Sequence, residues 1–238
     1  MITGISSMAP KIVLTVLARA YETRSGRTVA IQSVGGVDAA KRVSAGEPFD
    51  IVVLARDAID QLIAADHLVA GSEVDLMRSG VAVAVRAGGA RPDIASEDAL
   101  ERAVLAARTI GISTGPSGVA LARLFERWGI AEQLRDRIVT PPPGVPVGRL
   151  VARGEVALGF QQQSELAYLE GITVLGPLPP AIQIVTTFSG AVGAHSRLPV
   201  GARALLAFMA SPAATETKLR HGMDPVDVEQ PKHRRIEQ

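Results

Sequence analysis

Short apolar stretches alternate with helix-like stretches at the start of this chain, and this alternation is the feature that most restricts its fold. In residues 12–21 the apolar side chains recur at helical spacing, and Gly26 follows where a C-terminal cap belongs. The stretch DIVVL, residues 50–54, is apolar on both faces, which is typical of a buried strand in a parallel sheet. Further strands are predicted at 2–5 and 29–33, and further helices at 37–44 and 58–63. The pattern predicts βαβ units, and hence an α/β fold around a mostly parallel sheet.

Extended stretches interrupt the alternation later in the chain. Residues 80–86 (GVAVAVR) predict a strand that runs into the loop AGGARPD instead of a helix, so this strand is a candidate crossover. Residues 181–185 and 189–194 form a second long, loosely apolar extended stretch. Between them we expect a helix at 96–107 capped by Ser96, a strand at 109–113, a helix at 119–128 and a rigid proline loop at 140–146. That loop is too short for a flexible interdomain linker.

The composition excludes several classes of function. With 25 Lys and Arg against 24 Asp and Glu, the formal net charge is +1, which gives no overall field to attract a nucleic acid. Aromatic residues make up 3% of the chain, so stacking platforms for bases are scarce. The chain has no cysteine, and its four histidines lack metal-ligand spacing, so we expect no metal and no other cofactor. The GxSxG, GxxxxGK[ST] and GxGxxG signatures are also absent.

Three predicted strands end in small or hydroxyl residues directly before a predicted helix. These strand ends are GISS at 4–7, SVGG at 33–36 and STGPSG at 113–118. Backbone N–H groups at a helix start bind anions without Lys or Arg, because they are free and lie at the positive end of the helix dipole. Ser and Gly are also common in ordinary caps and turns, but open α/β sheets bind ligands at the carboxyl ends of their strands. The repetition predicts an anion site.

At this point the chain resembles a known family. The stretches ISSMAPKIVLTVLARAYETRSGRTV, SVGGVDAAKRVSAGEPFDIVVLA, GVAVAVRAG, ISTGPSGVALARLFERWGI and ALLAFMASPAATETKLRHGMDP follow one another in the order found in molybdate-binding proteins. Those proteins are type II periplasmic, solute-binding proteins of ABC transporters. The resemblance implies two α/β lobes, each with a mostly parallel sheet, that are joined by two crossover strands and clamp a ligand between them. The first lobe would comprise residues 1–79 plus 188–238, and the second residues 80–187.

The resemblance also implies where ligand contacts lie. They fall on Ser6 and Ser7, on Ser33, Gly35 and Gly36, on Ser117 and Gly118, on Val147, and on Gln161 and Gln162. At the second of these places the family has a hydroxyl where this chain has glycine, and Gln162 stands where molybdate binders commonly have a tyrosine. A glutamine side chain both donates and accepts hydrogen bonds, whereas a tetrahedral oxyanion uses donors only. We therefore expect a small organic carboxylate instead of molybdate.

The polar residues around these places leave alternatives open. Strand alternation predicts that Gln161 and Gln163 point one way and Gln162 the other, and a solvent-facing helix start explains the glutamine run equally well. Arg56 directly follows the strand DIVVLA, and Arg149 follows the proline loop. Either could pair with a carboxylate, although a solvated surface arginine is the more common case.

Two main functions follow. The leading one is a solute-binding protein that closes over a small oxyanion or carboxylate and presents its closed form to an ABC permease. The alternative is an enzyme on the same fold, namely an isomerase or tautomerase of an unsaturated carboxylic acid, with Asp38 or Glu165 as candidate base. The sequence favours the binding protein over the enzyme. An intracellular effector-binding module is a third, weaker alternative.

The start of the chain bears on where the protein works. The first residues lack the basic leading region and small-residue cleavage site of a secretion signal. We therefore expect a periplasmic protein if a leader was removed before Met1, and a cytoplasmic one if Met1 is the native start.

Overall fold

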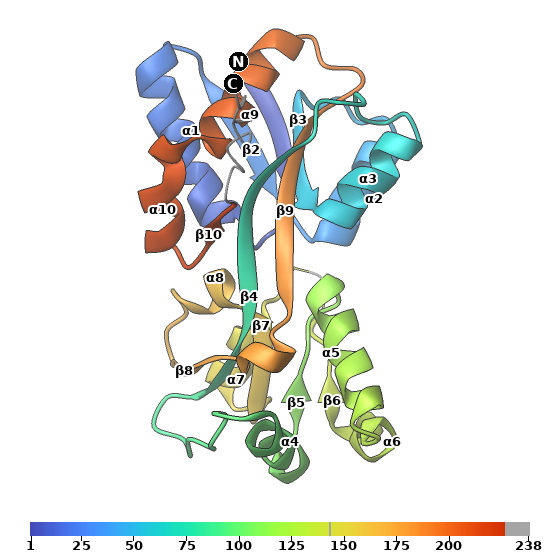
Figure 1. The fold of residues 1–238 in the computed structure, drawn as a ribbon, viewed down its shortest axis with the longest axis vertical. Coiled ribbons are helices and arrows are strands. Elements are labelled where there is room, and N and C mark those ends of the chain that lie inside the picture. Colours follow the sequence, from blue (N-terminus) through green and yellow to red (C-terminus); the bar gives the residue numbers. More distant parts are fainter. Residues whose placement is uncertain (143, 227–238) are drawn as a thin grey trace, which may run out of the picture.

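The computed structural model describes residues 1–142 and 144–226, and these form two α/β lobes joined by two long strands (Figure 1). Each lobe contains parallel strand pairs, and one of the two connecting strands pairs with strands of both sheets. The predicted fold class, a type II periplasmic-binding-protein fold with two crossover strands, is confirmed. None of the helices in these ranges is long and apolar enough to cross a membrane.

The first lobe contains the predicted βαβ units. Strand β1 (Ile2–Ser6) lies between β2 (Val29–Ser33) and β3 (Ile51–Ala55), and it is parallel to both. Its helices are α1 (Lys11–Ser25), α2 (Gly36–Ser44), α3 (Arg56–Ala64), α9 (Pro199–Ala210) and α10 (Thr215–Arg220), and the short strand β10 (Asp224–Pro225) joins its sheet. Its core is largely aliphatic, as the scarcity of aromatic residues requires.

The second lobe is built in the same way. Strand β5 (Ile110–Gly111) is parallel to β6 (Ile138–Val139) and to β7 (Leu158–Gln162), and β8 (Ile172–Pro177) pairs with a connecting strand. Its helices are α4 (Glu97–Ala106), α5 (Pro116–Arg127), α6 (Ala131–Leu134), α7 (Val147–Arg153) and α8 (Gln163–Leu166). Phe125 and Phe160 meet edge to face in its core.

The two connecting strands are β4 (Val74–Arg86) and β9 (Val185–Val192), which pair antiparallel where they pass between the lobes (Figure 1). The predicted lobe boundaries fall inside them, and Ser79 and Gly80 of β4 pair with Thr186 and Val185 of β9. The boundaries themselves stay a prediction, and residues 227–238 of the first predicted lobe lie outside the described residues. The expected extended stretch at 181–185 is wrong in part, because Pro180–Ile182 forms a turn of 3-10 helix.

Local signals predicted several helix ends. Gly26 has a left-handed φ of 69°, and its N–H donates to the Glu22 carbonyl over 2.8 Å. The Ser96 hydroxyl accepts from the Ala99 N–H over 3.2 Å, as expected of an N-cap. The expectation that Ser6 and Ser7 stand directly before the first helix is wrong. A turn at Met8–Pro10 follows β1, so α1 begins only at Lys11.

Candidate functional site

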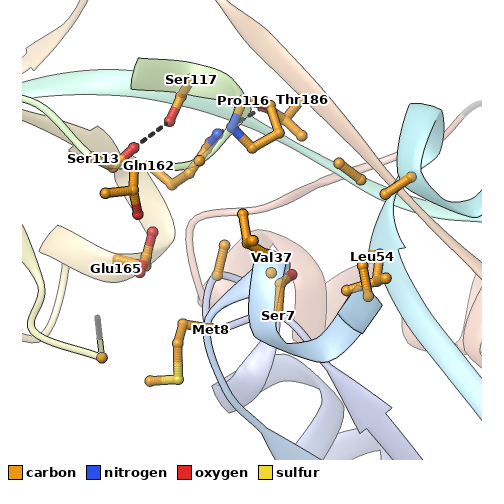
Figure 2. Close-up of a pocket in the computed structure, with 18 of the residues that line it drawn as sticks. Ser7, Met8, Val37, Leu54, Ser113, Pro116, Ser117, Gln162, Glu165 and Thr186 are labelled. Atoms are coloured by element: carbon orange, nitrogen blue, oxygen red, sulfur yellow. Dashed lines mark hydrogen bonds between the residues drawn. The ribbon is translucent and has the colours of Figure 1, made fainter. Parts of the chain in front are cut away.

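A cleft of about 670 Å³ lies between the lobes, and crossover strand β9 contributes to its wall (Figure 2). Ser7, Met8, Val37 and Leu54 line one side, and Ser113, Ser117, Gln162 and Glu165 line the other. Thr186 and Phe188 come from β9. The cleft is therefore at the place where the resemblance predicts the ligand.

Several helices begin at this cleft. Gly36, Pro116 and Val147 line it, and they are the first residues of α2, α5 and α7, while Ala9 lines it shortly before α1 begins. The first N–H groups of a helix have no partner within the helix, and the dipole places positive charge there. These converging helix starts make the cleft suited to an anion.

Ser7 and Ser6 are neighbours in the chain but differ in their surroundings. The Ser7 hydroxyl is buried at the wall of the cleft and has no hydrogen-bond partner in the described part of the chain. The Ser6 hydroxyl is fully buried, donates to the Ser7 carbonyl over 3.0 Å and lies 2.8 Å from the Ser33 hydroxyl. Ser6 and Ser33 therefore join the ends of β1 and β2, and neither lines the cleft.

Of the predicted glycine pair, only Gly36 lines the cleft. Gly35 precedes α2 as its N-cap, and a Cβ there would lie 3.3 Å from an Asp38 carboxylate oxygen. Asp38, one of the two candidate bases, is exposed and does not line the cleft.

Ser117 and Gly118 are neighbours in the chain, but only Ser117 lines the cleft. Ser117 lines the cleft, and its hydroxyl lies 3.1 Å from the hydroxyl of Ser113 (Figure 2). Gly118 does not line the cleft. Its backbone packs so closely on the preceding loop that a Cβ at this position would lie 1.7 Å from the Ser113 carbonyl oxygen.

The Gly118→Ala substitution should therefore destabilise the protein, by about 2–4 kcal/mol, because the α5 start must move away from Ser113. Urea unfolding measures this loss. The matched control is Gly115→Ala, whose Cβ would meet nothing nearer than the Ser113 hydroxyl at 3.9 Å. Equal stability of the two variants would contradict the close packing of Gly118.

The glutamine run does not alternate as predicted. Gln161 and Gln162 are both buried and both line the cleft, whereas Gln163 is exposed. The strand alternation cannot extend to Gln163, because β7 ends at Gln162 and the chain turns there into α8. The alternative of a solvent-facing helix start holds for Gln163 alone.

The two buried glutamines make different hydrogen bonds. The Gln161 Oε1 accepts from the Gly148 N–H over 3.1 Å, near the start of α7. The Gln162 Nε2 donates to the Thr186 Oγ1 over 2.8 Å (Figure 2). The Gln162 Oε1 is buried and has no partner among the residues described.

Glu165 is the candidate base that the fold brings to the cleft, from α8 (Figure 2). Burial raises the pKa of the Glu165 carboxyl to about 7, and a hydrogen bond from the Gln161 side chain opposes the rise. A carboxyl group with a pKa near neutrality can take up and release a proton at physiological pH.

The candidate arginines lie away from the cleft. Arg56 donates to Asp75 over 2.7 Å and to Asp60 over 3.0 Å, so its guanidinium is engaged in ion pairs on the surface. Arg149 is exposed, and neither arginine lines the cleft. Lys41, in α2, is a basic residue that does line it. No group of three or more His, Cys, Asp or Glu side chains in the described ranges could hold a metal ion.

Sequence reasoning missed several lining residues, among them Met8, Leu54, Thr186 and Phe188. Thr186 and Phe188 belong to β9, which comes beside the cleft only when the lobes are assembled. Met8 lies between two predicted elements, and Leu54 ends a predicted strand. Both are apolar, and an apolar residue looks the same in the sequence whether it packs in a core or contacts a ligand.

Comparisons with known proteins agree with the fold. An aconitate isomerase from Pseudomonas sp. is 38% identical over 218 residues, which is 88% of this chain and 82% of that protein. The periplasmic molybdate-binding protein of Azotobacter vinelandii superposes with a TM-score of 0.77 at 19% identity, over 94% of this chain and 98% of that one. The substrate-binding domain of a putative molybdenum ABC transporter from Clostridium difficile gives a TM-score of 0.73 at 14% identity, over 95% and 99%.

The family comparison covers almost the whole described chain. Residues 2–224 match the family described as bacterial extracellular solute-binding protein. A match of this extent includes both lobes, both crossover strands and every wall of the cleft. This chain therefore belongs to the bacterial extracellular solute-binding proteins and has the type II periplasmic fold of the molybdate-binding proteins that its sequence resembles.

Proposed function

We propose that this protein binds a small unsaturated polycarboxylic acid of the aconitate type in the cleft and isomerises it by moving a proton. The observation that carries the proposal is Glu165, a carboxyl group at the wall of an anion-binding cleft whose pKa is raised to about 7. Similarity to the aconitate isomerase of Pseudomonas sp. over 88% of the chain supports it.

The lining of the cleft favours an organic acid over an inorganic oxyanion. Helix starts and the hydroxyls of Ser7 and Ser117 offer donors for carboxylate oxygens. Met8, Val37 and Leu54 add apolar surface, which a carbon skeleton can contact and a tetrahedral oxyanion cannot use. The cavity of about 670 Å³ falls within the usual range for organic ligands.

The proposed reaction needs one base. The ionised Glu165 carboxyl takes a proton from the carbon next to the double bond, and the electron pair of that C–H bond forms a new double bond. The electrons of the old double bond move toward the conjugated carboxyl group, where the helix starts stabilise the negative charge. Return of the proton from Glu165 to the far end of the allylic system gives the isomer, so no other reactant is consumed.

The test is to follow trans-aconitate by ¹H NMR in the presence of the protein. We expect conversion to the cis isomer, and in D₂O we expect deuterium to enter the allylic positions because Glu165 exchanges its proton with solvent. Absence of both conversion and exchange, with the acid bound, would contradict the isomerase.

A panel of ligands tests the class of molecule that binds. A carboxylate at about 100 times its Kd should stabilise the protein by about 2.7 kcal/mol, which corresponds to a rise in Tm of roughly 5–10 °C. Molybdate, tungstate, sulfate and phosphate should leave the Tm unchanged. A large shift with molybdate alone would contradict the proposal of a carboxylate site.

Family membership favours a second candidate, a receptor without chemistry. In that role the protein would bind the carboxylate outside the cytoplasm and deliver it to a membrane permease of the ABC type. Both candidates predict a thermal shift with the acid, and only the isomerase predicts conversion and exchange.

A further inference from the structure

The side-chain oxygen of Gln162 is a buried hydrogen-bond acceptor to which no described residue donates. Gln162 is 5% exposed, and its Oε1 has no hydrogen-bond partner within the described ranges. Buried polar atoms in folded proteins nearly always have a partner, because an unpaired one costs free energy. Since Gln162 lines the cleft, a bound molecule is the natural partner for this atom.

The neighbouring contacts fix what that partner must offer. The Gln162 Nε2 already donates to Thr186, so the free end of the amide is its carbonyl oxygen. Gln161 already has protein partners at both ends of its amide, because its Oε1 accepts from Gly148 and its amide group donates to Glu165. A carboxylate oxygen can accept from Ser7, but it has no proton to give to Gln162. A fully ionised carboxylate therefore leaves the Gln162 oxygen unpaired.

We propose that Gln162, held by Thr186, is a specificity-determining residue that selects acids carrying an O–H group and accepts a hydrogen bond from it. This inference rests on the proposed function, namely that the cleft binds a carboxylic acid. The O–H group can come from a hydroxyl on the ligand, as in citrate, or from a carboxyl group that keeps its proton. For an acid without a hydroxyl, such as aconitate, it is the protonated carboxyl.

A protonated carboxyl at Gln162 would also help the proposed reaction. When the C–H proton moves to Glu165, the electron pair ends on the carboxyl group conjugated to the double bond. A neutral carboxyl takes up that pair with one negative charge, whereas an ionised carboxylate would carry two. The Gln162 Oε1 can only accept a hydrogen bond, so it pairs with the O–H of a protonated carboxyl and not with an ionised carboxylate. This hydrogen bond therefore favours the neutral form of the carboxyl.

The test measures binding by titration calorimetry in the Glu165→Gln variant, which has no titratable group at position 165 and is expected to turn over the ligand far more slowly. With trans-aconitate near neutral pH, buffers of different ionisation enthalpy should report proton uptake on binding. Adding Gln162→Met, which keeps the bulk and removes the acceptor, should abolish this uptake and weaken binding about tenfold or more. With citrate the substitution should weaken binding to a similar degree without a change in proton uptake.

A control variant accompanies this test, and the results that would refute the role of Gln162 differ from those that would refute the proposed function. Gln163→Met changes the adjacent exposed glutamine and should leave both acids unaffected. Equal affinities with and without Gln162→Met, or weaker aconitate binding with no proton uptake in either protein, would overturn the role of Gln162 while leaving the carboxylate site intact. Failure of every carboxylate to bind the unmodified protein would instead refute the proposed function, and this inference with it.

Discussion

Replacing Glu165 with glutamine is expected to lower the rate of aconitate isomerisation by about 10²- to 10⁴-fold, the usual contribution of a general base. The amide has nearly the same shape as the carboxyl but cannot take a proton. Binding of the acid should persist, because the helix starts and Ser7 lie on other elements of the cleft. Rates from ¹H NMR and affinities from calorimetry separate the two effects.

The pH dependence of the isomerisation rate also tests whether Glu165 is the base. Because the pKa of Glu165 is raised to about 7, the rate in the unmodified protein should rise with pH up to about 7 and then level off. The control is Glu170→Gln, an exposed glutamate outside the cleft, which should leave the profile unchanged. An active Glu165→Gln variant with the same profile would show that another group moves the proton.

The pH dependence of the free energy of unfolding tests the raised pKa of Glu165 even if the protein is not an enzyme. The pKa of Glu165 is raised from 4.5 to about 7 in the folded protein, so between these pH values the folded state binds more protons than the unfolded state. The free energy of unfolding therefore falls as the pH rises through this window. At pH 8 the Glu165→Gln variant should be more stable than the unmodified protein, by about 1–3 kcal/mol, and below pH 4.5 the difference should vanish.

The fold could be predicted because its signals are local and repeated. DIVVL at 50–54 is apolar on both faces, and β3 occupies Ile51–Ala55 at the centre of the first sheet. Gly26 and Ser96 end and begin helices through bonds within a few residues of themselves. The starts of α2 and α5 at the cleft were predicted for the same reason, since small residues between a strand and a helix are visible in the sequence.

The polar residues of the site depend on contacts that the sequence does not display. Ser6 and Ser7 look alike in the sequence, yet only Ser7 lies at the cleft, because β1 pairs with β2 through Ser6 and Ser33 and ends there. Thr186 comes from a crossover strand far along the chain, and its bond to Gln162 orients that amide. The burial that raises the pKa of Glu165 likewise arises only when the lobe is assembled.

The adjacent serines yield the sharpest test of where the ligand binds. Ser7→Ala should weaken acid binding by roughly 10- to 100-fold, because a hydrogen bond to a charged group contributes about 1.5–3 kcal/mol. Its hydroxyl has no hydrogen-bond partner in the described part of the protein, so its loss should leave the Tm unchanged or slightly higher. Ser7→Leu should abolish binding, since the larger side chain enters the cleft.

Ser6→Ala is the matched control, with the opposite expected pattern. It removes the hydroxyl that bonds to the Ser7 carbonyl and to Ser33, so it should lower stability by about 1–2 kcal/mol. Because Ser6 does not line the cleft, the affinity for the acid should change far less than in Ser7→Ala. Thermal unfolding and calorimetry of the two variants give both quantities. If Ser6→Ala weakens binding more than Ser7→Ala does, the acid is not held by Ser7, and the anion site must be sought elsewhere among the helix starts.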